Sequence, residues 1–532
     1  MVLRYWLPGH EPGRPRASTH GSDTSGPKAP RLPGGGPRRY DGIAGRPRCC
    51  WNPHPGLPMA HAQSPKIGAL AFVACALVTG CAPQPTATDG RSWLAGDHHI
   101  HSRYSVGWDR SSEPPTPVVA GDGVYPIPTN ALMAREFGLS WMVATDHGGP
   151  NHSKVNLELA YPELLLARDS VPQVIQFFGM EFDTPGADHS SLIVPHTHDE
   201  AERVHEIEST FSKNEPWPAD PSWDTEPRML DALRAMRDFP ARPVVIANHP
   251  SRSAPGLGQY GFDHPAELRD WNDTAPEVAV GMAGAPGHQA VTLGRPQGAR
   301  GGYGNFPTLG GFDQMTARLG GFWDSMLGEG RAWWITANSD SHVNWREGGA
   351  DFWPGEYSKT YVWAERSHDD ILAGIRSGRV FVTTGDLLSQ LFVTASVDGA
   401  DAHIGGTLNV AVGADVSVTI RFLDPTGPNA NGDDPTVARV DLIAGRVTGP
   451  VEDRSADTNP TTRVLMRWTD ESWETDGPFR VMRFVLEDLE GDLYVRVRGT
   501  NGPELEPEPD PRGENPWTDL WFYSNPIFVN AR

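Results

Sequence analysis

Four short apolar segments between residues 139 and 342 are each followed, within two residues, by a histidine or a carboxylate. The segments are LSWMVAT, VIQFFGM, PVVIAN and AWWITAN, and the residues that follow them include His147, Glu181, His249 and Asp340. Each segment has the length and the composition of a buried strand. Because active-site side chains of a (β/α) barrel converge at the carboxyl ends of its strands, the pattern predicts one shared site.

A fifth histidine-rich segment, Asp97-His98-His99-Ile100-His101, precedes these four in a chain with 19 histidines. On a strand, His99 and His101 point to the same face, about 7 Å apart along the chain. Two imidazoles on one face can chelate a single divalent ion. An H-x-H pair alone is weak evidence, but here TDHGG, GMEFDTPGADH, ANHPSR and NSDSH follow it in order.

The hydrophobic pattern divides the chain into two structural parts. Residues 94–385 alternate helix-like and short apolar segments, which is typical of an α/β fold. Within them, the Gly-rich residues 251–330 are predicted to be a long ordered insertion over the mouth of a barrel. Residues 386–532 alternate apolar and polar residues between Gly, Pro, Asn and Asp, which predicts an antiparallel β-sandwich. A packing or spacer role and a carbohydrate-binding role remain open for the sandwich.

The N-terminal residues have the composition of targeting segments. Residues 1–58 are rich in Arg, Pro and Gly and are predicted to be a non-native or disordered leader. Residues 59–81 have a short apolar core that ends in VTGC, as in a lipoprotein signal peptide, with Cys81 as the lipidated residue. Residues 82–93 are then a polar tether. The sequence thus predicts an exported bacterial lipoprotein of the cell envelope, attached to the membrane through Cys81.

Cysteine content and charge restrict the chemistry. All four cysteines lie at or before Cys81, so the remaining chain has neither disulfides nor thiolate ligands, and a metal site must use His and carboxylates. The formal net charge is −22, and removal of the leader's nine basic and three acidic residues leaves about −28. Such a surface repels polyanions, and nucleic acid is not an expected partner.

The order and spacing of the five motifs resemble the PHP (polymerase and histidinol phosphatase) family of metallohydrolases, over residues 94–385. This resemblance implies a distorted (β/α)7 barrel with two or three divalent ions, Zn, Mn or Fe. Glu181 would bridge the first two ions, and His147 and His342 would serve the third. The implied ligands are His99, His101, His147, Glu181, His189, His249, Asp340 and His342.

The chain departs from the family pattern at two positions. Val106 stands where the family has the aspartate of the third metal site, so we expect weak or absent occupancy there unless Asp109 takes its place. His98 stands where the family usually has an apolar residue, and we expect it to face away from the ions. Asp97 is expected to orient a ligand histidine from outside the metal shell.

The resemblance implies hydrolysis of a phosphate mono- or diester by a metal-activated hydroxide. Arg252, three residues after His249, is a candidate clamp for the phosphate, with a structural ion pair as the equal alternative. His288 is a candidate proton donor to the leaving group, with a simple loop residue as its alternative. The small-molecule substrate and the oligomeric state are not determined by the sequence.

Two other functions are compatible with the sequence. The layout of signal, barrel and sandwich also resembles the PHP branch that contains carbaryl hydrolases, in which the same nucleophile would attack a carbamate or ester carbonyl. A non-catalytic surface-binding protein is the second alternative, which the valine at position 106 supports. No G-x-S-x-G or P-loop motif is present.

Overall fold

The computed structural model describes residues 90–532. The predicted leader 1–58, the signal segment 59–81 with its lipidated Cys81, and residues 82–89 of the predicted tether lie outside the described residues. The first strand, β1, begins at Ser92. The end of the predicted tether 82–93 is therefore part of the fold, because the Trp93 ring packs edge-on against Trp363 and Phe381.

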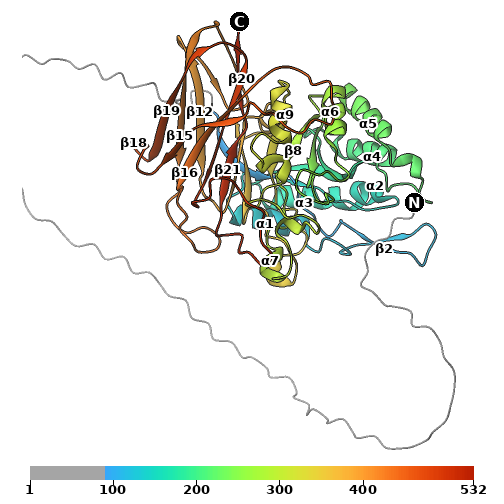
Figure 1. Ribbon diagram of the computed structural model, residues 1–532. Coiled ribbons are helices and arrows are strands. Elements are labelled where there is room, and N and C mark those ends of the chain that lie inside the picture. Colours follow the sequence, from blue (N-terminus) through green and yellow to red (C-terminus); the bar gives the residue numbers. More distant parts are fainter. Residues whose placement is uncertain (1–89) are drawn as a thin grey trace, which may run out of the picture. The chain divides into compact units, whose positions relative to one another are not determined.

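The chain forms a mixed α/β structure with one large mixed sheet and a separate antiparallel sheet (Figure 1). In the large sheet, seven strands from the first two thirds of the chain lie side by side. Their order is β1 (Ser92–Asp97), β4 (Trp141–Ala144), β5 (Ile175–Asp183), β6 (His189–Ile193), β7 (Val244–Asn248), β8 (Ala279–Ala285) and β9 (Trp334–Ala337).

The two ends of this row of strands come together. The β1–β4, β4–β5, β7–β8 and β8–β9 pairs are parallel, and β6 is antiparallel to both of its neighbours. Just past β1 and β9, an isolated parallel bridge joins Ile100 to Ser341. The residues that follow the first and the last strand of the row are therefore neighbours in space.

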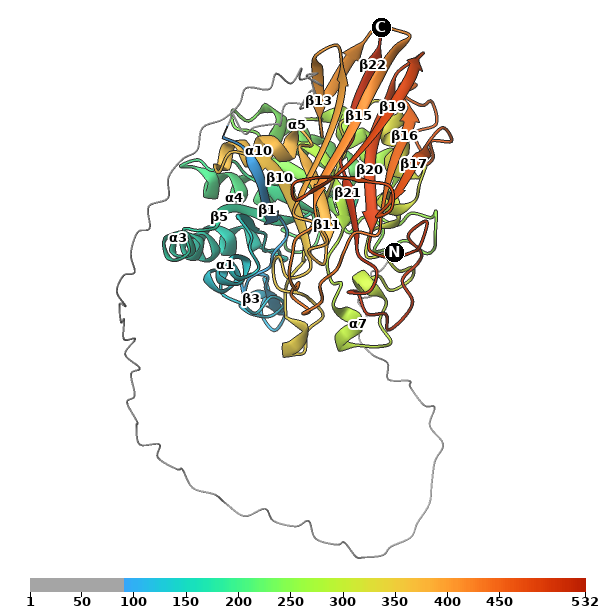
Figure 2. The same cartoon turned by 90° about the vertical axis from the view of Figure 1, so that its left-hand side faces the viewer.

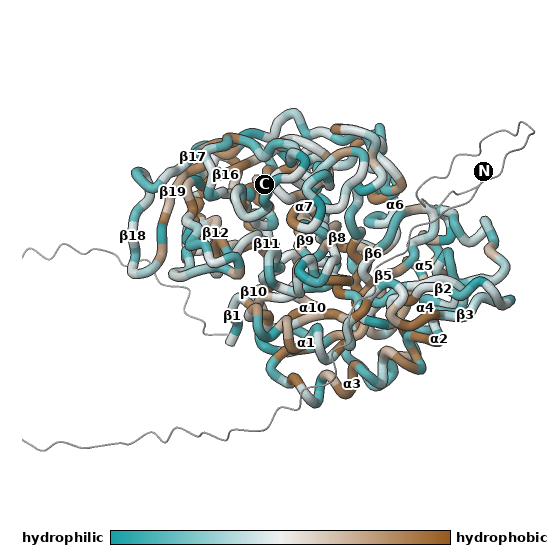
Figure 3. Tube along the Cα trace, turned by 90° about the horizontal axis from the view of Figure 1, so that it is seen from below, coloured by the Kyte–Doolittle hydropathy of each residue, from teal (hydrophilic) through white to brown (hydrophobic). Residues whose placement is uncertain are grey.

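The strands of the row are buried on both faces, since β4, β7 and β9 are buried at every position. Figure 3 shows hydrophobic residues gathered on the central strands, including β5 and β6. Helices cover the row: α1 (Ile127–Glu136), α2 (His152–Val155), the π-helix η1 (Asn156–Ala160), α3 (Tyr161–Ser170), α4 (Glu200–Phe211), η2 (Pro221–Trp223), α5 (Glu226–Asp238) and α10 (His368–Arg376).

Helix α10 illustrates how the sequence specifies these helices. Its N-cap residue, Ser367, accepts a hydrogen bond from the backbone N–H of Asp370, which satisfies a donor that the first turn leaves free. Ile371 and Ile375, four residues apart, lie on the buried face of the helix. Capping at one end and an apolar stripe along one side are the signals of an amphipathic surface helix.

The prediction that residues 251–330 form one insertion is wrong. They contain strand β8 of the row and helices α6 (Pro265–Thr274), α7 (Val291–Gly294), η3 (Arg300–Gly302), α8 (Gln314–Ala317) and α9 (Phe322–Gly328). The glycines partly reflect close packing, because a Cβ on Gly281 in β8 would lie 1.9 Å from the Trp334 carbonyl oxygen of β9. Glycine in a strand can mark such a close backbone approach.

The large sheet continues from the row into the C-terminal third of the chain (Figure 2). Strand β10 pairs with β1, β11 with β10, and β21 with β11. The strands of this part are β10 (Ser358–Ala364), β11 (Val380–Thr384), β14 (Thr407–Val410), β16 (Arg439–Arg446), β17 (Arg463–Thr469), β20 (Leu493–Thr500), β21 (Trp521–Ser524) and β22 (Ile527–Ala531).

The second sheet is antiparallel and belongs wholly to the C-terminal part. Its order is β13 (Ala400–His403), β12 (Gln390–Val397), β15 (Ala414–Leu423), β19 (Phe479–Leu489) and β18 (Glu474–Asp476). Along β15, buried and less buried residues alternate, so one face of this sheet covers a core. A small hairpin of β2 (Gly107–Asp109) and β3 (Thr116–Val118) and the short helix η4 (Trp345–Glu347) complete the elements.

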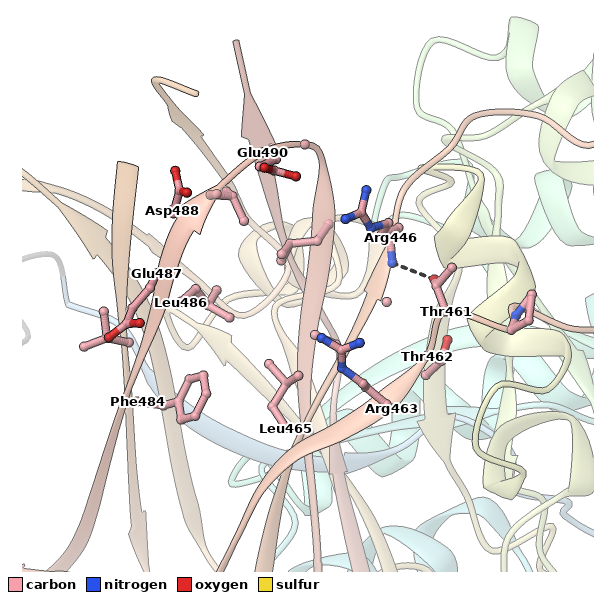
Figure 4. Close-up of a pocket in the computed structure, with 17 residues that line it drawn as sticks. Arg446, Thr461, Thr462, Arg463, Leu465, Phe484, Leu486, Glu487, Asp488 and Glu490 are labelled. Carbon is pink, nitrogen blue, oxygen red and sulfur yellow. Dashed lines mark hydrogen bonds between the residues drawn. The ribbon is translucent and has the colours of Figure 1, made fainter. Parts of the chain in front are cut away.

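A cavity lies at one edge of the C-terminal strands. It has a volume of ≈ 630 Å³ and is lined by residues of β16, β17, β19 and β20. Figure 4 shows Arg446 and Arg463 on one side, Glu487, Asp488 and Glu490 on the other, and Phe484 and Leu465 below them. None of the predicted site residues lines this cavity, so its size does not mark it as the reaction site.

A buried ion pair ties the C-terminal sheet to helix α9. The Asp324 carboxylate of α9 accepts hydrogen bonds from Nε and Nη2 of Arg496 in β20, at 2.8 and 2.7 Å. Tyr494 donates to the same carboxylate, and Trp323 lies against the guanidinium.

None of the helices in residues 90–532 combines the length and hydrophobicity that a membrane span needs.

We expect Asp324→Ala to destabilise the fold by about 3–5 kcal/mol, because it leaves the fully buried Arg496 guanidinium without its counter-ion. The midpoint of urea unfolding measures the change. Asp231→Ala removes one partner of the exposed pair with Arg234 and should leave the midpoint unchanged. Equal shifts for the two variants would contradict a stabilising role of the buried pair.

Candidate metal centre

The polar residues at or just after the ends of the strands of the row lie close together. His99 and His101 follow β1, His147 follows β4, His249 follows β7, and Asp340 and His342 follow β9. Glu181 lies near the end of β5, and His189 opens the antiparallel β6. All eight residues that the sequence predicted as ligands fall into groups whose donor atoms lie within 4.8 Å of one another.

The first group is fully buried and contains His99, His101, Glu181 and Asp340. The Nε2 atom of His99 lies 3.1 Å from Oε1 of Glu181 and 3.2 Å from Oδ1 of Asp340. The Nε2 atom of His101 lies 3.0 Å from the same Asp340 oxygen, and the two Nε2 atoms are 2.9 Å apart. Two imidazoles and two carboxylates thus point at one common centre.

The second group shares Glu181 with the first. Oε1 of Glu181 lies 3.1 Å from Nδ1 of His189 and 3.1 Å from Nε2 of His249. Its other oxygen, Oε2, lies 3.4 Å from Nε2 of His101. Burial by itself would raise the pKa of Glu181, but the surrounding histidines, His189 and His99 above all, hold it well below its usual range. Glu181 is thus an ionised carboxylate between two groups of imidazoles.

The third group consists of His101, His147 and His342. A carboxylate lies beside it that the sequence analysis did not identify: Oδ2 of Asp122 is 3.0 Å from Nε2 of His147 and 3.4 Å from Nε2 of His342. Burial opposes ionisation of Asp122, yet the two histidines keep its pKa well below the usual range. Asp122 therefore stands where a third cation would need an anionic ligand.

Neither Val106 nor Asp109 supplies that carboxylate. Val106 is part of the hydrophobic core. The side chain of Asp109 is exposed and accepts a hydrogen bond from the backbone N–H of Ser111. Asp122 reaches the site because its loop lies against the first motif, where its backbone N–H donates to the carbonyl oxygen of Ser105.

The glycines on both sides of Asp122 permit this approach. A Cβ on Gly121 would lie 2.3 Å from the backbone nitrogen of Gly107, and one on Gly123 would lie 2.1 Å from the carbonyl oxygen of Ser102. No side chain fits at either position without a shift of backbone. The G-D-G triplet is the sequence signal that could have identified this carboxylate.

The donor atoms of these groups are arranged for a shared cation rather than for hydrogen bonds with one another. Nδ1 of His189 is buried and makes no hydrogen bond in the structure, although Glu181 is 3.1 Å away. The two Nε2 atoms of His99 and His101 face each other, and both approach the same carboxylate oxygen of Asp340. Buried imidazole lone pairs and carboxylates that converge in this way could hold a metal ion.

The backbone is strained at three residues of the site. His249, His288 and Asp340 have φ values of 32°, 55° and 47°, in the left-handed region that non-glycine residues rarely adopt. Such a conformation costs of order 1–3 kcal/mol and persists only where the surroundings impose it. Beside Asp340, a Cβ on Gly287 would lie 2.3 Å from the Asp340 Cβ, so the loop that carries His288 packs directly on this turn.

Several residues outside the groups fix the ligands in place. Nδ1 of His101 lies 2.7 Å from the Ser105 hydroxyl, which donates to Asp146. Nε2 of His189 lies 3.4 Å from Asp183. A carboxylate or hydroxyl on the second ring nitrogen sets the tautomer and the orientation of a ligand histidine.

Asp97 has a different role from the predicted one. Its carboxylate accepts hydrogen bonds from the backbone N–H groups of His99 and Ser339, both at 3.1 Å, and holds the main chain after β1 and β9 rather than an imidazole ring. Burial raises the pKa of Asp97 to about 7, and these hydrogen bonds act against that rise. Asp97 thus joins the two segments that carry the first group of ligands.

His288 and Arg252 both lie at the centre and both have carboxylate partners. Nε2 of His288 is 2.6 Å from Asp340 and its Nδ1 is 2.5 Å from Asp351. Burial lowers the pKa of His288, but the two carboxylates raise it well above the ordinary value. Arg252 donates to both oxygens of Asp188, so the ion pair is present, although about a third of the arginine side chain is exposed.

A second acidic group lies away from the centre and has its own counter-ion. Asp510, Glu514 and Asp519 are close enough to hold a cation. The buried guanidinium of Arg300 occupies the space among them, with Nε 3.3 Å from Asp510 and a hydrogen bond from Nη1 to Asp519 at 2.7 Å. Within residues 90–532 we therefore consider the histidine-rich centre as the candidate metal site.

We expect Asp122→Asn to lower the affinity for one bound Mn²⁺ or Zn²⁺ by at least about 10-fold, because even residues outside the first metal shell contribute 10–100-fold. Calorimetric titration of the metal-free protein, with elemental analysis after dialysis, measures affinity and stoichiometry. Asp109→Asn is the matched control and should bind metal like the parent. The Asp122 assignment would be wrong if both variants matched the parent, or if Asp109→Asn alone lost an ion.

Comparison with known proteins adds little to these observations. No family model matches the chain, and no curated protein matches it. Two solved structures have parts similar to this chain, each 12% identical over 24% of this chain with a TM-score of 0.14: a chitin binding domain from Burkholderia pseudomallei and a polysaccharide monooxygenase CBM33. The chain spans 57% and 60% of those two chains. Similarity this low carries no argument about fold or function.

Proposed function

We propose that this protein is a metal-dependent hydrolase that cleaves phosphate mono- or diesters at a centre of two or three divalent ions. The supporting observation is the position of Glu181. Its Oε1 oxygen faces His99 of the first group as well as His189 and His249 of the second, and its Oε2 oxygen faces His101. A buried carboxylate between two imidazole groups is suited to bridge two cations, which an isolated structural metal site does not need.

The proposal assigns each group of residues to one ion. His99, His101, Glu181 and Asp340 would hold the first, and Glu181, His189 and His249 the second. His147, His342 and Asp122 would hold the third. The row of strands that carries them would be the distorted (β/α)7 barrel of the PHP family, and the bridge between Ile100 and Ser341 is compatible with a closed barrel. The same proposal locates the enzyme in the cell envelope, anchored through Cys81.

When bound, such ions lower the pKa of a coordinated water and offset negative charge on a phosphoryl group. The protein's own residues provide the geometry for this chemistry. Asp97 fixes the main chain on both sides of the first group, and Asp183 orients His189. The apolar strands beneath exclude bulk water, which strengthens electrostatic interactions at the centre.

His288 is the residue best suited to deliver a proton. Both of its ring nitrogens face carboxylates, Asp340 and Asp351, so each nitrogen carries a proton in this arrangement. Its side chain is about one-fifth exposed, which leaves it accessible to a substrate. We assign His288 to protonation of the leaving group, and Arg252 to binding of a substrate anion at the exposed side of its pair with Asp188.

Phosphoester specificity can be tested against carbonyl specificity. The purified protein, supplied with Mn²⁺ or Zn²⁺, should hydrolyse bis-p-nitrophenyl phosphate or p-nitrophenyl phosphate faster than aryl esters and aryl carbamates. Glu181→Gln and His99→Ala should each lower the rate by more than about 100-fold, because they remove ligands. His403→Ala, an exposed histidine on β13, is the control.

Each other result of this assay has a definite meaning. Turnover confined to esters or carbamates would replace the phosphoesterase proposal with carbonyl hydrolysis at the same centre. Full activity in both ligand variants would contradict a metal mechanism. Metal binding without turnover of any of these substrates would favour the non-catalytic binding protein.

The role of His288 predicts a dependence on the leaving group. For His288→Asn we expect a loss of about 10²–10⁴-fold with phenyl or alkyl phosphate esters, which need a proton on departure. With p-nitrophenyl esters, whose leaving group departs as an anion, the rate should fall much less. Initial rates at matched metal content measure both. Equal losses for the two kinds of ester would show that His288 acts as a ligand or a structural residue.

A further inference from the structure

A chain of buried hydrogen bonds runs beneath the metal centre and ends on Glu181. The ring nitrogens of His98 lie 2.8 Å from the Thr336 hydroxyl and 3.0 Å from the Ser191 hydroxyl. Ser191 donates to Oδ1 of Asn248 at 2.9 Å, and Nδ2 of Asn248 donates to Oε1 of Glu181 at 3.2 Å. All of these side chains except Glu181 stand outside the proposed ligand set.

Glu181, at the end of this chain of hydrogen bonds, fixes which group donates and which accepts between His98 and Glu181. An ionised carboxylate only accepts, so Asn248 must present its amide N–H to Glu181 and its oxygen to Ser191. Ser191 has one proton and uses it for that oxygen. Nδ1 of His98 must therefore donate to Ser191, whether the imidazole is neutral or charged. His98 thus sets the orientation of the Ser191 hydroxyl and, through it, of the Asn248 amide.

The chain connects strands that lie far apart in the row. Thr336 belongs to β9, His98 directly follows β1, Ser191 belongs to β6 and Asn248 to β7. His98, Ser191 and Asn248 have no exposed surface, and Thr336 is 3% exposed. A buried polar network is stable only when each member has a partner, and in that state it fixes one geometry.

His98 itself is not placed as a ligand. Among the described residues, it belongs to none of the groups that can hold a metal. Both of its ring nitrogens are used by hydroxyl groups on β6 and β9, two strands that are not neighbours in the row. An apolar side chain could fill the same volume, but it could not supply the donor that Ser191 needs. The histidine at this position therefore has a specific hydrogen-bonding task.

We propose that His98 is a positioning residue for the metal centre: through Ser191 and Asn248 it holds Oε1 of Glu181 in its place between His99 of the first group and His189 and His249 of the second. Without the His98 donor, the Ser191 hydroxyl can turn away, and the Asn248 amide loses the partner that fixes its orientation. The Glu181 carboxylate then keeps its negative charge, but its orientation is no longer fixed by the hydrogen bond from Asn248. The inference rests on the proposed role of Glu181 as a bridging ligand.

The test compares His98→Leu with His98→Asn in the full-length protein. Asparagine can place an amide N–H where Nδ1 of the imidazole stands, whereas leucine fills the volume without a donor. For His98→Leu we expect a 10–100-fold loss of affinity for Co²⁺, as for other residues that orient metal ligands, and an altered visible absorption spectrum of the Co²⁺-loaded protein. His98→Asn should restore most of the affinity and the parent spectrum. Both quantities are measured well below the unfolding temperature.

Ser191→Ala tests the same chain without changing His98, and serves if His98→Leu does not fold. It should lower Co²⁺ affinity by a similar factor, and His98→Leu combined with Ser191→Ala should be no weaker than either single variant, because both break one chain. Additive losses, or unchanged affinity and spectra in folded single variants, would overturn the proposal. If the parent protein itself binds no Co²⁺, Mn²⁺ or Zn²⁺, the proposed function fails, and the role of His98 fails with it.

Discussion

The centre of this protein depends on two buried carboxylates, Glu181 and Asp340, surrounded by imidazole rings. Removing a carboxylate from water costs several kcal/mol unless positive charge or hydrogen bonds compensate. Burial would raise the pKa of both acids, but the imidazoles hold it well below the usual range: His189 and His99 above all for Glu181, and His288 and His99 for Asp340. A neutral imidazole can donate one hydrogen bond to an acid, but positive charge is present only if the rings are protonated or if cations lie between the rings and the acids. The proposed metal centre is the second of these solutions for the ligand histidines, while His288 beside Asp340 is protonated.

The rest of the structure keeps these groups from moving apart. Left-handed backbone at His249, His288 and Asp340 would relax in a loose fold, so the strands beneath must be rigid. The fully buried β4, β7 and β9 provide that rigidity. The C-terminal strands add to it, because β21 extends the same sheet through β11 and Arg496 is paired with Asp324 on helix α9. One physical role of the C-terminal part is therefore support for the scaffold of the site.

Two differences between expectation and structure have the same cause. Glycine-rich sequence suggested an insertion over residues 251–330, and the loop around Asp122 carried no metal-binding motif. In both places glycine serves close packing: Gly281 allows β8 to approach β9, and Gly121 and Gly123 allow a loop to lie on the first motif. A single sequence shows that glycines are present but not which backbone they approach. Contacts of that kind are tertiary, and they decide which carboxylate reaches the third histidine group.

The sequence by itself determined the kinds of ligand and their attachment to strand ends. The chain after Cys81 has no cysteine, which restricts a metal site to imidazoles and carboxylates. Apolar segments followed by His, Glu or Asp can be recognised locally as buried strands with polar residues at their ends. Only the tertiary structure decided which residues complete the centre. Asp122 lies beside His147 and His342, Asp97 holds main chain instead of a ring, and His98 meets hydroxyls on β6 and β9. The physical reason is that hydrogen bonds and ligand directions depend on distances of about 3 Å between segments tens to hundreds of residues apart, which no local pattern encodes.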